Sequence, residues 1–576
     1  MKKIPYGISS FERIATQNYY YIDKTRFIPE LESIGVFLFF IRPRRFGKSS
    51  LLTLLESYYD IARKEEFDTL FRDTYIKKHP TPEKNSYLIL KFNFSQVNPD
   101  PEKVEESFNE HINECIFTFD EKYRGFLGDK YFKIMDTKKS AHGKIGFLFN
   151  YMGQIGRKVY VLIDEYDHFA NTILSTAGAS SYHQITHGTG FLRFFFNVLK
   201  GAADTSRSSV GRLFITGVSP VTMDDVTSGF NIGLNISLYP EFNELLGFTD
   251  RDMGHIIDYF KLSAFSDRNT LIATMKEWCG NYRFFDDADI DMYNPTMILH
   301  IVQHLKRLKK LPKNMVDHNL RIDYSKLRHL LTIDRRLNGN FARLSTIIER
   351  GGITADIADS FPVERLTHSE NFISLLYYFG LLTYGGRDIL RIPNRTVKKL
   401  MYDYLRDGYE DVDVFAVDLW ELANLIRGMA YRGEWRQAFN FLADEVEKQT
   451  AIRDYLTGEK VIQTFLLAYL NVTDFYLTRT EDEFNKGFVD LYLEPFLEKY
   501  DDLKYGYLIE LKYIRRGDYT DSSAKEKVEE KWIEAEKQLR QYADDPRLIG
   551  DKRIQTKYVA LLFCGWELKA TKEFNF

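Results

Sequence analysis

The chain has 576 residues, of which 44% are hydrophobic and 28% are charged, so we expect three or four soluble globular domains. Its formal net charge of −4 excludes a strong overall attraction to nucleic acid, and any such contact must come from a local basic face. The three cysteines have no metal-binding spacing and no apolar run is long enough to span a bilayer, so we expect a cytoplasmic protein without a membrane anchor.

Four short apolar runs in the first half of the chain are predicted to be strands. Each run is rich in β-branched or aromatic residues and is bounded by charge or glycine. Such runs are typical of strands that are buried on both faces of a parallel sheet, with helices between them. We therefore expect an α/β domain over residues 1–240. Its predicted strands are 36–41, 86–94, 159–163 and 213–216.

A basic loop follows the first predicted strand. It reads RPRRFGKSS over residues 42–50 and leads into a helical stretch, 51–59. In a strand–loop–helix unit of this kind the loop amides and the helix dipole face an anion, which is how P-loops bind nucleotide phosphates. Arg42 stands where the usual GxxxxGK[ST] pattern has its first glycine. The predicted nucleotide-binding residues are Arg45, Gly47, Lys48, Ser49 and Ser50.

The residues of this loop and of a later strand end have distinct predicted roles. Gly47 allows close approach of the backbone, Lys48 can reach the β- and γ-phosphates of ATP, and Ser49 can be a ligand of Mg²⁺. The run 159–163 is followed directly by two carboxylates, of which Asp164 would hold the magnesium ion and Glu165 would polarise the attacking water. The sequence therefore predicts an ATPase site with ATP and Mg²⁺ as cofactors.

Other candidates near this site have weaker support. Thr216 and Ser219 could sense the γ-phosphate, although an ordinary strand-end turn explains them equally well. Arg283 could reach the nucleotide from a lid, but a structural arginine is the preferred interpretation. Arg207 and Arg212 lie near the run 213–216 and are weak candidates for an arginine finger.

The rest of the chain is predicted to hold a helical region and a second, smaller domain. Residues 241–445 show mainly the helical period and are expected to form a lid and a linker. Residues 446–576 are expected to form an α+β domain, in which a helix precedes three strand-like runs. The predicted elements there are helix 460–470, strands 487–493, 505–513 and 557–563, and helix 523–542.

The C-terminal domain carries a second group of catalytic candidates. Glu510 and Lys512 lie two residues apart in an apolar strand, so their side chains share a face, and Asp490 lies in the preceding strand. Two carboxylates suit Mg²⁺ or Mn²⁺, and the lysine can orient water and stabilise the developing phosphate charge. This is the D…ExK pattern of PD-(D/E)xK nucleases, although alternating charges on a solvated strand are a common alternative. The predicted nuclease residues are Asp490, Glu510 and Lys512. Glu459 and Gln538 are added because they resemble further positions of that superfamily, as does Tyr542, one turn after Gln538.

Several motifs resemble those of the bacterial AAA-ATPase-like family. They are IPYGISSF at 4–11, YIDKT at 21–25, RPRRFGKS at 42–49, DEYD at 164–167 and TGVS at 216–219. In that family an arginine at the position of Arg42 is usual, and the chain commonly ends in a PD-(D/E)xK nuclease-like domain. The resemblance implies a P-loop NTPase domain with a parallel sheet, a helical lid or middle region, and a C-terminal α+β restriction-endonuclease-like domain.

Together these motifs predict an ATP-controlled nuclease that acts on nucleic acid phosphodiesters, with DNA favoured over RNA as the partner and a homo-oligomer left open. One alternative is a nucleotide-dependent switch or binding protein whose C-terminal domain binds nucleic acid or protein without cutting it. Another is a plain NTPase that acts on protein partners.

Overall fold

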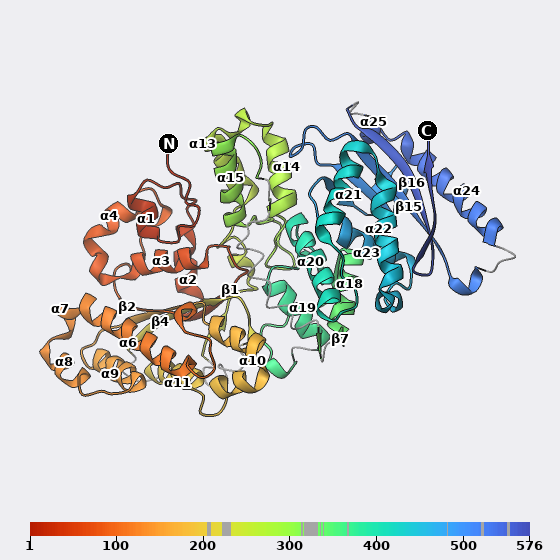
Figure 1. Cartoon of the computed structure of the whole chain (residues 1–576). Coiled ribbons are helices and arrows are strands. Elements are labelled where there is room, and N and C mark those ends of the chain that lie inside the picture. The colour runs from red at the N-terminus through yellow and green to blue at the C-terminus, as the bar shows by residue number, and fades with distance from the viewer. Residues whose placement is uncertain are drawn as a thin grey trace. The chain divides into compact units, whose positions relative to one another are not determined.

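The computed structural model describes residues 1–576 except 204–208, 222–231, 313–314, 316–331, 334–335, 338, 366–367, 481, 520–523 and 550–552. The described chain forms two compact units (Figure 1). The N-terminal unit contains residues 1–309 and 353–396, and the C-terminal unit contains residues 397–576 together with helix α18 (Gly339–Arg350). No helix among the described residues is long and apolar enough to cross a membrane.

The N-terminal unit is built on five parallel strands in the order β2-β3-β4-β1-β5. All four predicted strands are confirmed, and their burial accounts for the continuous apolar runs. The loop after β1 and the carboxylates after β3 follow the carboxyl ends of parallel strands, so they meet at one edge of the sheet. The strands are β1 (Phe37–Ile41), β2 (Leu88–Asn93), β3 (Val159–Asp164), β4 (Val210–Gly217) and β5 (Leu234–Asn235).

Helices cover both faces of this sheet (Figure 1). Phenylalanine rings fill the space between helices and sheet: the ring centroids of Phe94 and Phe108 are 5.3 Å apart, and those of Phe94 and Phe195 are 5.6 Å apart. The high aromatic content therefore serves core packing in this unit. Helix α3 (Lys48–Tyr59) lies on one face, and α6 (Val104–Lys122), α9 (Ala141–Gln154) and α11 (Phe191–Ala203) lie on the other.

Side chains from the α6 region close the exposed edge of strand β2. The backbone N–H of Ile89 donates to Tyr123 Oη at 2.9 Å, and that of Asn93 donates to His111 Nε2 at 3.2 Å. Unpaired groups on an edge strand invite pairing with other chains. These two bonds therefore protect the sheet at the edge farthest from β5.

The helical region predicted for 241–445 does not form a domain of its own. Residues 241–309 and 353–396 pack within the N-terminal unit, and residues 397–445 pack within the C-terminal unit. The region also holds a three-stranded sheet, in the order β8-β10-β9, whose strands are too short to show a strand period in the sequence. Its elements are α13 (Asp250–Phe260), α14 (Arg268–Cys279), α15 (Pro295–Leu308), β8 (Gly352–Thr354), α19 (Ser369–Tyr378), β9 (Thr383–Gly386), β10 (Ile389–Arg391) and α20 (Arg395–Asp411).

The C-terminal unit contains a mixed sheet in the order β11-β14-β15-β16-β17. Strands β15 and β16 are parallel and are connected through the long helix α24, and the other neighbouring pairs are antiparallel. Trp532, Ala535 and Leu539 of α24 pack with Leu508 and Ile514 of β15 in one buried core. The elements are β11 (Tyr476–Arg479), β14 (Leu491–Pro495), β15 (Tyr505–Ile514), α24 (Ala524–Ala543), β16 (Gln555–Cys564) and β17 (Glu567–Phe574).

The run 487–493, predicted as one strand, is broken at Asp490. Strand β13 (Gly487–Val489) pairs with β12 (Asp482–Phe484) in a separate hairpin, whereas β14 belongs to the main sheet. The side chain of Asp490 accepts a hydrogen bond from the backbone N–H of Leu511 at 2.8 Å, which fixes the bend against β15. The first nuclease candidate therefore lies between two sheets and not within a strand.

The remaining elements complete the two units. The predicted helices 460–470 and 523–542 are confirmed as α23 and α24. The other elements are α1 (Phe11–Thr16), α2 (Ile28–Ile34), α4 (Phe67–Leu70), α5 (Tyr75–Lys78), α7 (Arg124–Leu127), α8 (Asp129–Met135), α10 (His168–Thr186), β6 (Thr332–Ile333), β7 (Arg336–Leu337), α21 (Leu419–Arg432), α22 (Trp435–Lys448), α23 (Glu459–Leu470) and α25 (Pro546–Ile549).

Candidate active sites

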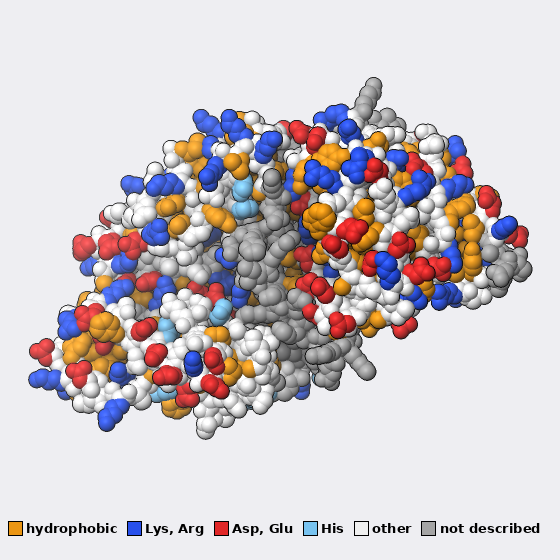
Figure 2. Space-filling view, in the orientation of Figure 1, with side chains coloured by type: hydrophobic (Ala, Val, Ile, Leu, Met, Phe, Trp, Pro, Cys, Tyr) orange, Lys and Arg blue, Asp and Glu red, His pale blue; other side chains and the backbone are white. Residues whose placement is uncertain are grey.

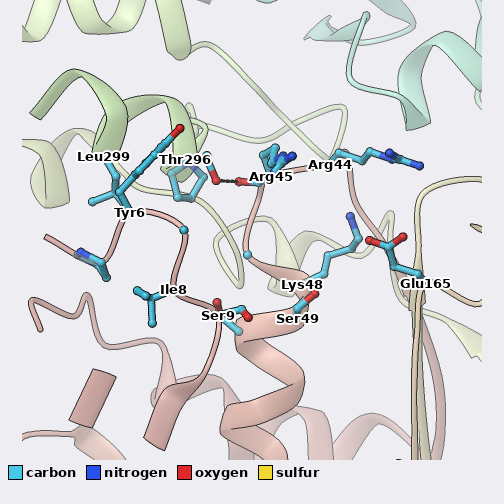
Figure 3. A pocket seen from close by; sticks show the side chains of 15 residues that line it. Tyr6, Ile8, Ser9, Arg44, Arg45, Lys48, Ser49, Glu165, Thr296 and Leu299 are labelled. Atoms are coloured by element: carbon cyan, nitrogen blue, oxygen red, sulfur yellow. Dashed lines mark hydrogen bonds between the residues drawn. The ribbon is translucent and has the colours of Figure 1, made fainter. Parts of the chain in front are cut away.

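A pocket of about 450 Å³ opens beside the loop after β1, between the N-terminal segment and the start of α15 (Figure 3). Its lining includes all five residues predicted to bind the nucleotide, and Glu165 lies opposite Lys48. The structure therefore brings the two halves of the predicted ATPase site together. The rest of the lining consists of Pro5, Tyr6, Gly7, Ile8, Ser9, Arg44, Pro295, Thr296 and Leu299.

The loop after β1 is held in a tight left-handed conformation. Arg45 and Gly47 have φ values of 69° and 102°, which turn the chain sharply into the first turn of α3. The start of α15 fixes this shape, because Thr296 Oγ1 donates to the carbonyl of Arg45 at 3.0 Å and Asn294 Nδ2 donates to that of Arg44 at 3.4 Å. The loop is therefore preorganised with the amino end of α3 open towards the pocket.

Lys48 is a buried cation at the end of this loop. It begins α3 and is only 6% exposed, and its Nζ donates to the carbonyl oxygens of Arg42 at 2.9 Å and Pro43 at 3.1 Å. Burial lowers the pKa of Lys48, and the nearby carboxylates of Glu165 and Asp164 oppose that shift. A phosphate would supply stronger acceptors for this ammonium group than the two carbonyls do.

Arg42, which departs from the usual loop pattern, is a structural anchor. Its guanidinium donates to the carbonyl oxygens of Ser237 at 2.5 Å and Phe242 at 3.0 Å. It also lies 4.3 Å and 4.2 Å from the ring centroids of Phe40 and Phe284. Burial lowers the pKa of Arg42 to about 10. The side chain therefore ties the phosphate loop to the segment after β5, a role that a glycine could not fill.

Asp164 and Ser49 lie together, as a shared magnesium site requires. Burial raises the pKa of Asp164, the nearby Ser49 hydroxyl opposes this shift, and the charge of Glu165 adds to it. Asp164 Oδ1 is buried and has no hydrogen-bond partner among the described residues. Burying an oxygen atom without a hydrogen-bond partner is costly. A Mg²⁺ ion held by Ser49 and Asp164 would give this oxygen a partner, so the residues fit the predicted ion.

Glu165 is strained and stays ionised. Its φ of 50° is uncommon for a residue with a side chain and is often found at functional sites. Burial alone would raise its pKa, but the contact with His168, whose Nδ1 lies 3.0 Å from Glu165 Oε2, and the charges of Lys48 and Arg44 lower it to about 2. Sequence reasoning missed His168, which the helical spacing of three residues after Glu165 could have indicated.

The motifs DEYD and TGVS pack directly against each other. Asp167 accepts hydrogen bonds from the backbone N–H groups of Val218 at 3.2 Å and Ser219 at 2.7 Å, and Tyr166 Oη donates to the carbonyl of Ser219 at 2.6 Å. A Cβ at Gly217 would collide with Asp167 Oδ1 and lie 2.5 Å from the Tyr166 ring. Tyr166 and Asp167 therefore hold the end of β4, and only Asp164 and Glu165 belong to the candidate ATPase site.

Thr216 and Ser219 do not line the pocket. Thr216 Oγ1 donates to the carbonyl of Phe40 at 2.8 Å, and Ser219 Oγ accepts from the backbone N–H of Val221 at 3.2 Å. Both side chains are 1% exposed. These contacts give each hydroxyl a structural partner, so the sensor role stays a prediction without support from the geometry.

The arginine candidates have other partners. Arg212 forms a forked ion pair with Glu83, with Nε–Oε2 and Nη2–Oε1 distances of 2.5 Å and 2.6 Å, near the start of β4 and so far from the pocket. The arginine-finger role of Arg212 therefore stays a prediction that this geometry does not support. Arg283 pairs with Asp291 at 2.7 Å, in agreement with the preferred structural interpretation. Arg207 lies outside the described residues.

The opposite end of the pocket is apolar, and sequence reasoning did not assign it to the site. Tyr6, Ile8 and Leu299 gather there, away from Lys48 and Glu165 (Figure 3). Thr53 of α3 holds the N-terminal segment in place, because its Oγ1 donates to the carbonyl of Ser9 at 2.7 Å. The motif IPYGISSF contains Tyr6 and Ile8, and it could have indicated that this segment belongs to the site.

In the C-terminal unit the second group of candidates converges on the α24 side of β15. Lys512 Nζ lies 2.9 Å from Glu510 Oε2 and 2.6 Å from Gln538 Oε1. This contact between Glu510 and Lys512 confirms that their side chains share one face, and both side chains are buried, at 1% and 5% exposed. Glu534 of α24 lies 3.5 Å from the same ammonium group, and sequence reasoning missed it.

The two carboxylates of this site cannot ionise independently. Burial and then the charge of Asp490 raise the pKa of Glu510 to about 8, although Lys512 opposes the shift. The pKa of Lys512 is raised despite its burial, chiefly by Glu510. Glu510 Oε1 is buried and finds no hydrogen-bond partner within the described part of the chain.

These residues fit a divalent metal ion as a pair of ligands. Across the described residues no three His, Cys, Asp or Glu side chains form a ready-made metal cage. Mg²⁺ usually keeps several waters and takes only one or two carboxylates together with substrate phosphate, so Asp490 and Glu510 are enough. An ion there would satisfy the buried Oε1 of Glu510 and relieve the repulsion between the carboxylates.

Two further candidates lie at the rim of this site. Glu459 begins α23, and burial followed by the charge of Asp490 raises its pKa, but it completes no three-carboxylate group within the described chain. Tyr542 Oη donates to the carbonyl of Phe488 at 3.0 Å. Both residues are therefore near the carboxylates without being part of the pair.

Comparisons with known proteins match the two parts of the chain that carry these sites. Residues 5–227 match the family model AAA-ATPase-like, described as a predicted AAA-ATPase, and residues 457–573 match a model of the PD-(D/E)XK nuclease superfamily. The chain is 28% identical over 312 residues to "Uncharacterized protein in vnfD 5'region" of Azotobacter chroococcum mcd 1, a match that covers 52% of each chain. The chain thus spans about half the length of this curated relative, and no solved structure matches it. The protein therefore combines an AAA-ATPase-like domain with a domain of the PD-(D/E)XK nuclease superfamily.

Proposed function

We propose that this protein is an ATPase that controls a metal-dependent nuclease acting on nucleic acid, with DNA favoured over RNA. The observation that carries the proposal is the group formed by Asp490, Glu510 and Lys512, in which Glu510 and Lys512 are buried and Asp490 is partly buried. A buried ion cluster is costly if it has only a structural role. A divalent ion and a phosphodiester would give each of these charges a partner.

The residues of this group would have different roles in phosphodiester hydrolysis. A divalent ion held by Asp490 and Glu510 would polarise the phosphate and lower the pKa of a bound water. Lys512 acts as a fixed positive charge and not as a base, because Glu510 raises its pKa. Gln538 and Glu510 hold its ammonium group in place, so that it stabilises the charge developing on the phosphate.

The N-terminal pocket has the polarity of a nucleoside triphosphate site. Lys48 and Arg44 supply positive charge at one end, where Ser49 and Asp164 would hold magnesium and the ionised Glu165 would activate water. The apolar end offers a surface of the kind that takes a flat base. This combination supports ATP over a simple phosphate ligand.

Nucleic acid would be recognised by local contacts and not by attraction to the overall charge of the protein. On the face shown in Figure 2, Lys and Arg side chains are interspersed with Asp and Glu, in keeping with the net charge of −4. Electrostatic attraction to phosphates is therefore weak over that face. We therefore expect contacts at the nuclease site itself to contribute to the affinity.

A second candidate function is a switch whose C-terminal domain binds nucleic acid or protein without cutting it. The observation in its favour is that Lys512 already has three acceptors, in Glu510, Gln538 and Glu534. A lysine with three such acceptors could have a purely structural role.

Incubation with plasmid, single-stranded DNA and RNA separates these functions. The proposal predicts cleavage that requires Mg²⁺ or Mn²⁺ and changes in rate when ATP is added. Failure to cut any of these substrates, with either metal and with ATP, supports the binding function. Cleavage at the same rate with and without ATP means that the ATPase does not control the nuclease.

Lys48→Ala is expected to weaken ATP binding by about thirtyfold or more, because it removes a charge-assisted contact to the β- and γ-phosphates. Titration of the folded variant with a fluorescent ATP analogue measures the loss. Lys130→Ala, which removes an exposed lysine of helix α8, is the matched control and should bind like the parent. Equal affinity in the Lys48 variant would rule out the phosphate-binding role of this loop.

The affinity of the nuclease site for Mn²⁺ is expected to increase with pH up to about 8. Burial and Asp490 raise the pKa of Glu510 to about 8, so below that pH the metal must displace a proton, and affinity should fall about tenfold per pH unit. By the same linkage, metal-free protein should lose stability as pH rises from the usual carboxyl range to about 8, because only the unfolded state has released this proton. Calorimetric titration in buffers of different ionisation enthalpy measures the proton release. A constant affinity between pH 6 and 8 would contradict the assignment.

A further inference from the structure

A large aromatic side chain is exposed next to the nuclease carboxylates. Phe488 is 57% exposed, although it lies only two residues before Asp490, at most about 7 Å along the chain. Phe484 and Val489 of the same hairpin are fully buried in the core of the unit. Phe488 therefore stands outside that core, close to the first metal-ligand candidate.

The hairpin that carries Phe488 is firmly attached to α24. At its turn, Asn485 Nδ2 donates to the carbonyl of Gln541 at 3.0 Å, and Gln541 Nε2 donates to the carbonyl of Asn485 at 2.7 Å. A Cβ at Gly487 would approach the Tyr542 ring to 2.6 Å, so hairpin and helix are in close contact. The exposed ring is thus carried on a fixed support, and little backbone freedom would be lost when it binds a ligand.

Tyr542 connects this hairpin to the catalytic residues. Its hydroxyl donates to the carbonyl of Phe488 at 3.0 Å. After burial, the charges of Glu510 and Asp490 are the largest contributions that raise the pKa of Tyr542. One side chain therefore touches the backbone of Phe488 and lies close to both carboxylates. A phosphodiester held at this site through a divalent ion on the two carboxylates would bring its neighbouring base within reach of the Phe488 ring.

We propose that Phe488 stacks on an unpaired nucleobase beside the scissile phosphodiester, so that the site prefers nucleic acid that is single-stranded at the cut. The inference rests on the proposed nuclease function. Every base offers a flat face to an aromatic ring, so stacking contributes affinity without sequence readout. A base within a duplex is already stacked and must be unstacked and unpaired at a cost before a protein ring can reach it.

Binding measurements in a Lys512→Ala background, which is expected to bind without cutting, test this inference in the full-length protein. The probes are a fluorescein-labelled single-stranded oligonucleotide and its blunt duplex, titrated by anisotropy with Mg²⁺ present. Phe488→Ala should weaken single-strand binding about tenfold or more, whereas Phe488→Trp should retain it. Ile533→Ala is the matched control, because Ile533 is 63% exposed on α24 of the same unit and should have no effect.

The outcomes separate this inference from the proposed function. Tight single-strand binding that depends on Asp490 but is unchanged by Phe488→Ala would overturn the stacking role and leave the nuclease proposal standing. An equal loss of duplex and single-strand binding would overturn the preference for an unpaired base. If the Lys512→Ala protein binds neither probe, with or without Mg²⁺, both proposals fall together.

Discussion

Replacing Lys512 with alanine is expected to remove nucleic acid cleavage while leaving metal binding nearly intact, and replacing Asp490 with alanine is expected to remove both. The lysine contributes a positioned positive charge, whose loss should slow cleavage by about 10²- to 10³-fold. Asp490 is one of two carboxylates available to the ion, so its loss leaves Glu510 alone. Metal-dependent cleavage and Mn²⁺ titration of the parent and the two variants measure the difference.

A structural contribution of Lys512 must be separated from a catalytic one. Because its ammonium group is bound to Glu510 and Gln538, its removal leaves a buried carboxylate without a counter-ion, and circular dichroism should confirm that the variant is folded. Lys537→Ala removes an exposed lysine from the same helix and should cut like the parent. If the parent cuts and all three variants cut equally well, the active site lies elsewhere in the chain.

Much of the fold could be predicted because its strands follow simple rules. Strands β1 to β4 are buried on both faces, and continuous apolar runs bounded by charge or glycine indicate such strands directly. The two candidate sites could be located in the sequence for a related reason. Each combines charged residues with an adjacent apolar strand, and buried charge of this kind is costly without a function.

The features that were missed depend on contacts between distant segments. Tyr6 lies far from Leu299 in the sequence, and only the folded chain brings the two to one end of the pocket. Arg42 could be recognised as an anchor only when the carbonyl of Phe242 was seen beside it. The bend at Asp490 could not be predicted, because two short strands that join different sheets can have the same sequence pattern as one continuous strand.

Glu165→Gln is expected to bind ATP with nearly parental affinity but to hydrolyse it at least about 10²-fold more slowly. The substitution keeps the shape of the side chain and removes the charge that polarises the attacking water. The contact with His168 and the charges of Lys48 and Arg44 outweigh burial and lower the pKa of Glu165 to about 2, so the parent group is ionised throughout the physiological range. The activity of the parent should therefore show no titration of this residue between pH 5 and 8.

Single-turnover hydrolysis and nucleotide titration distinguish a catalytic role of Glu165 from a role in binding. Glu106→Gln is the matched control, since Glu106 is an exposed acid in the first turn of α6 and should leave both measurements unchanged. His168→Ala should have a smaller effect than Glu165→Gln, because it releases the carboxylate without removing it. Parental turnover by Glu165→Gln would mean that another residue activates the water. A loss of ATP affinity equal to the loss of rate would mean that Glu165 contributes to binding and not to the chemical step.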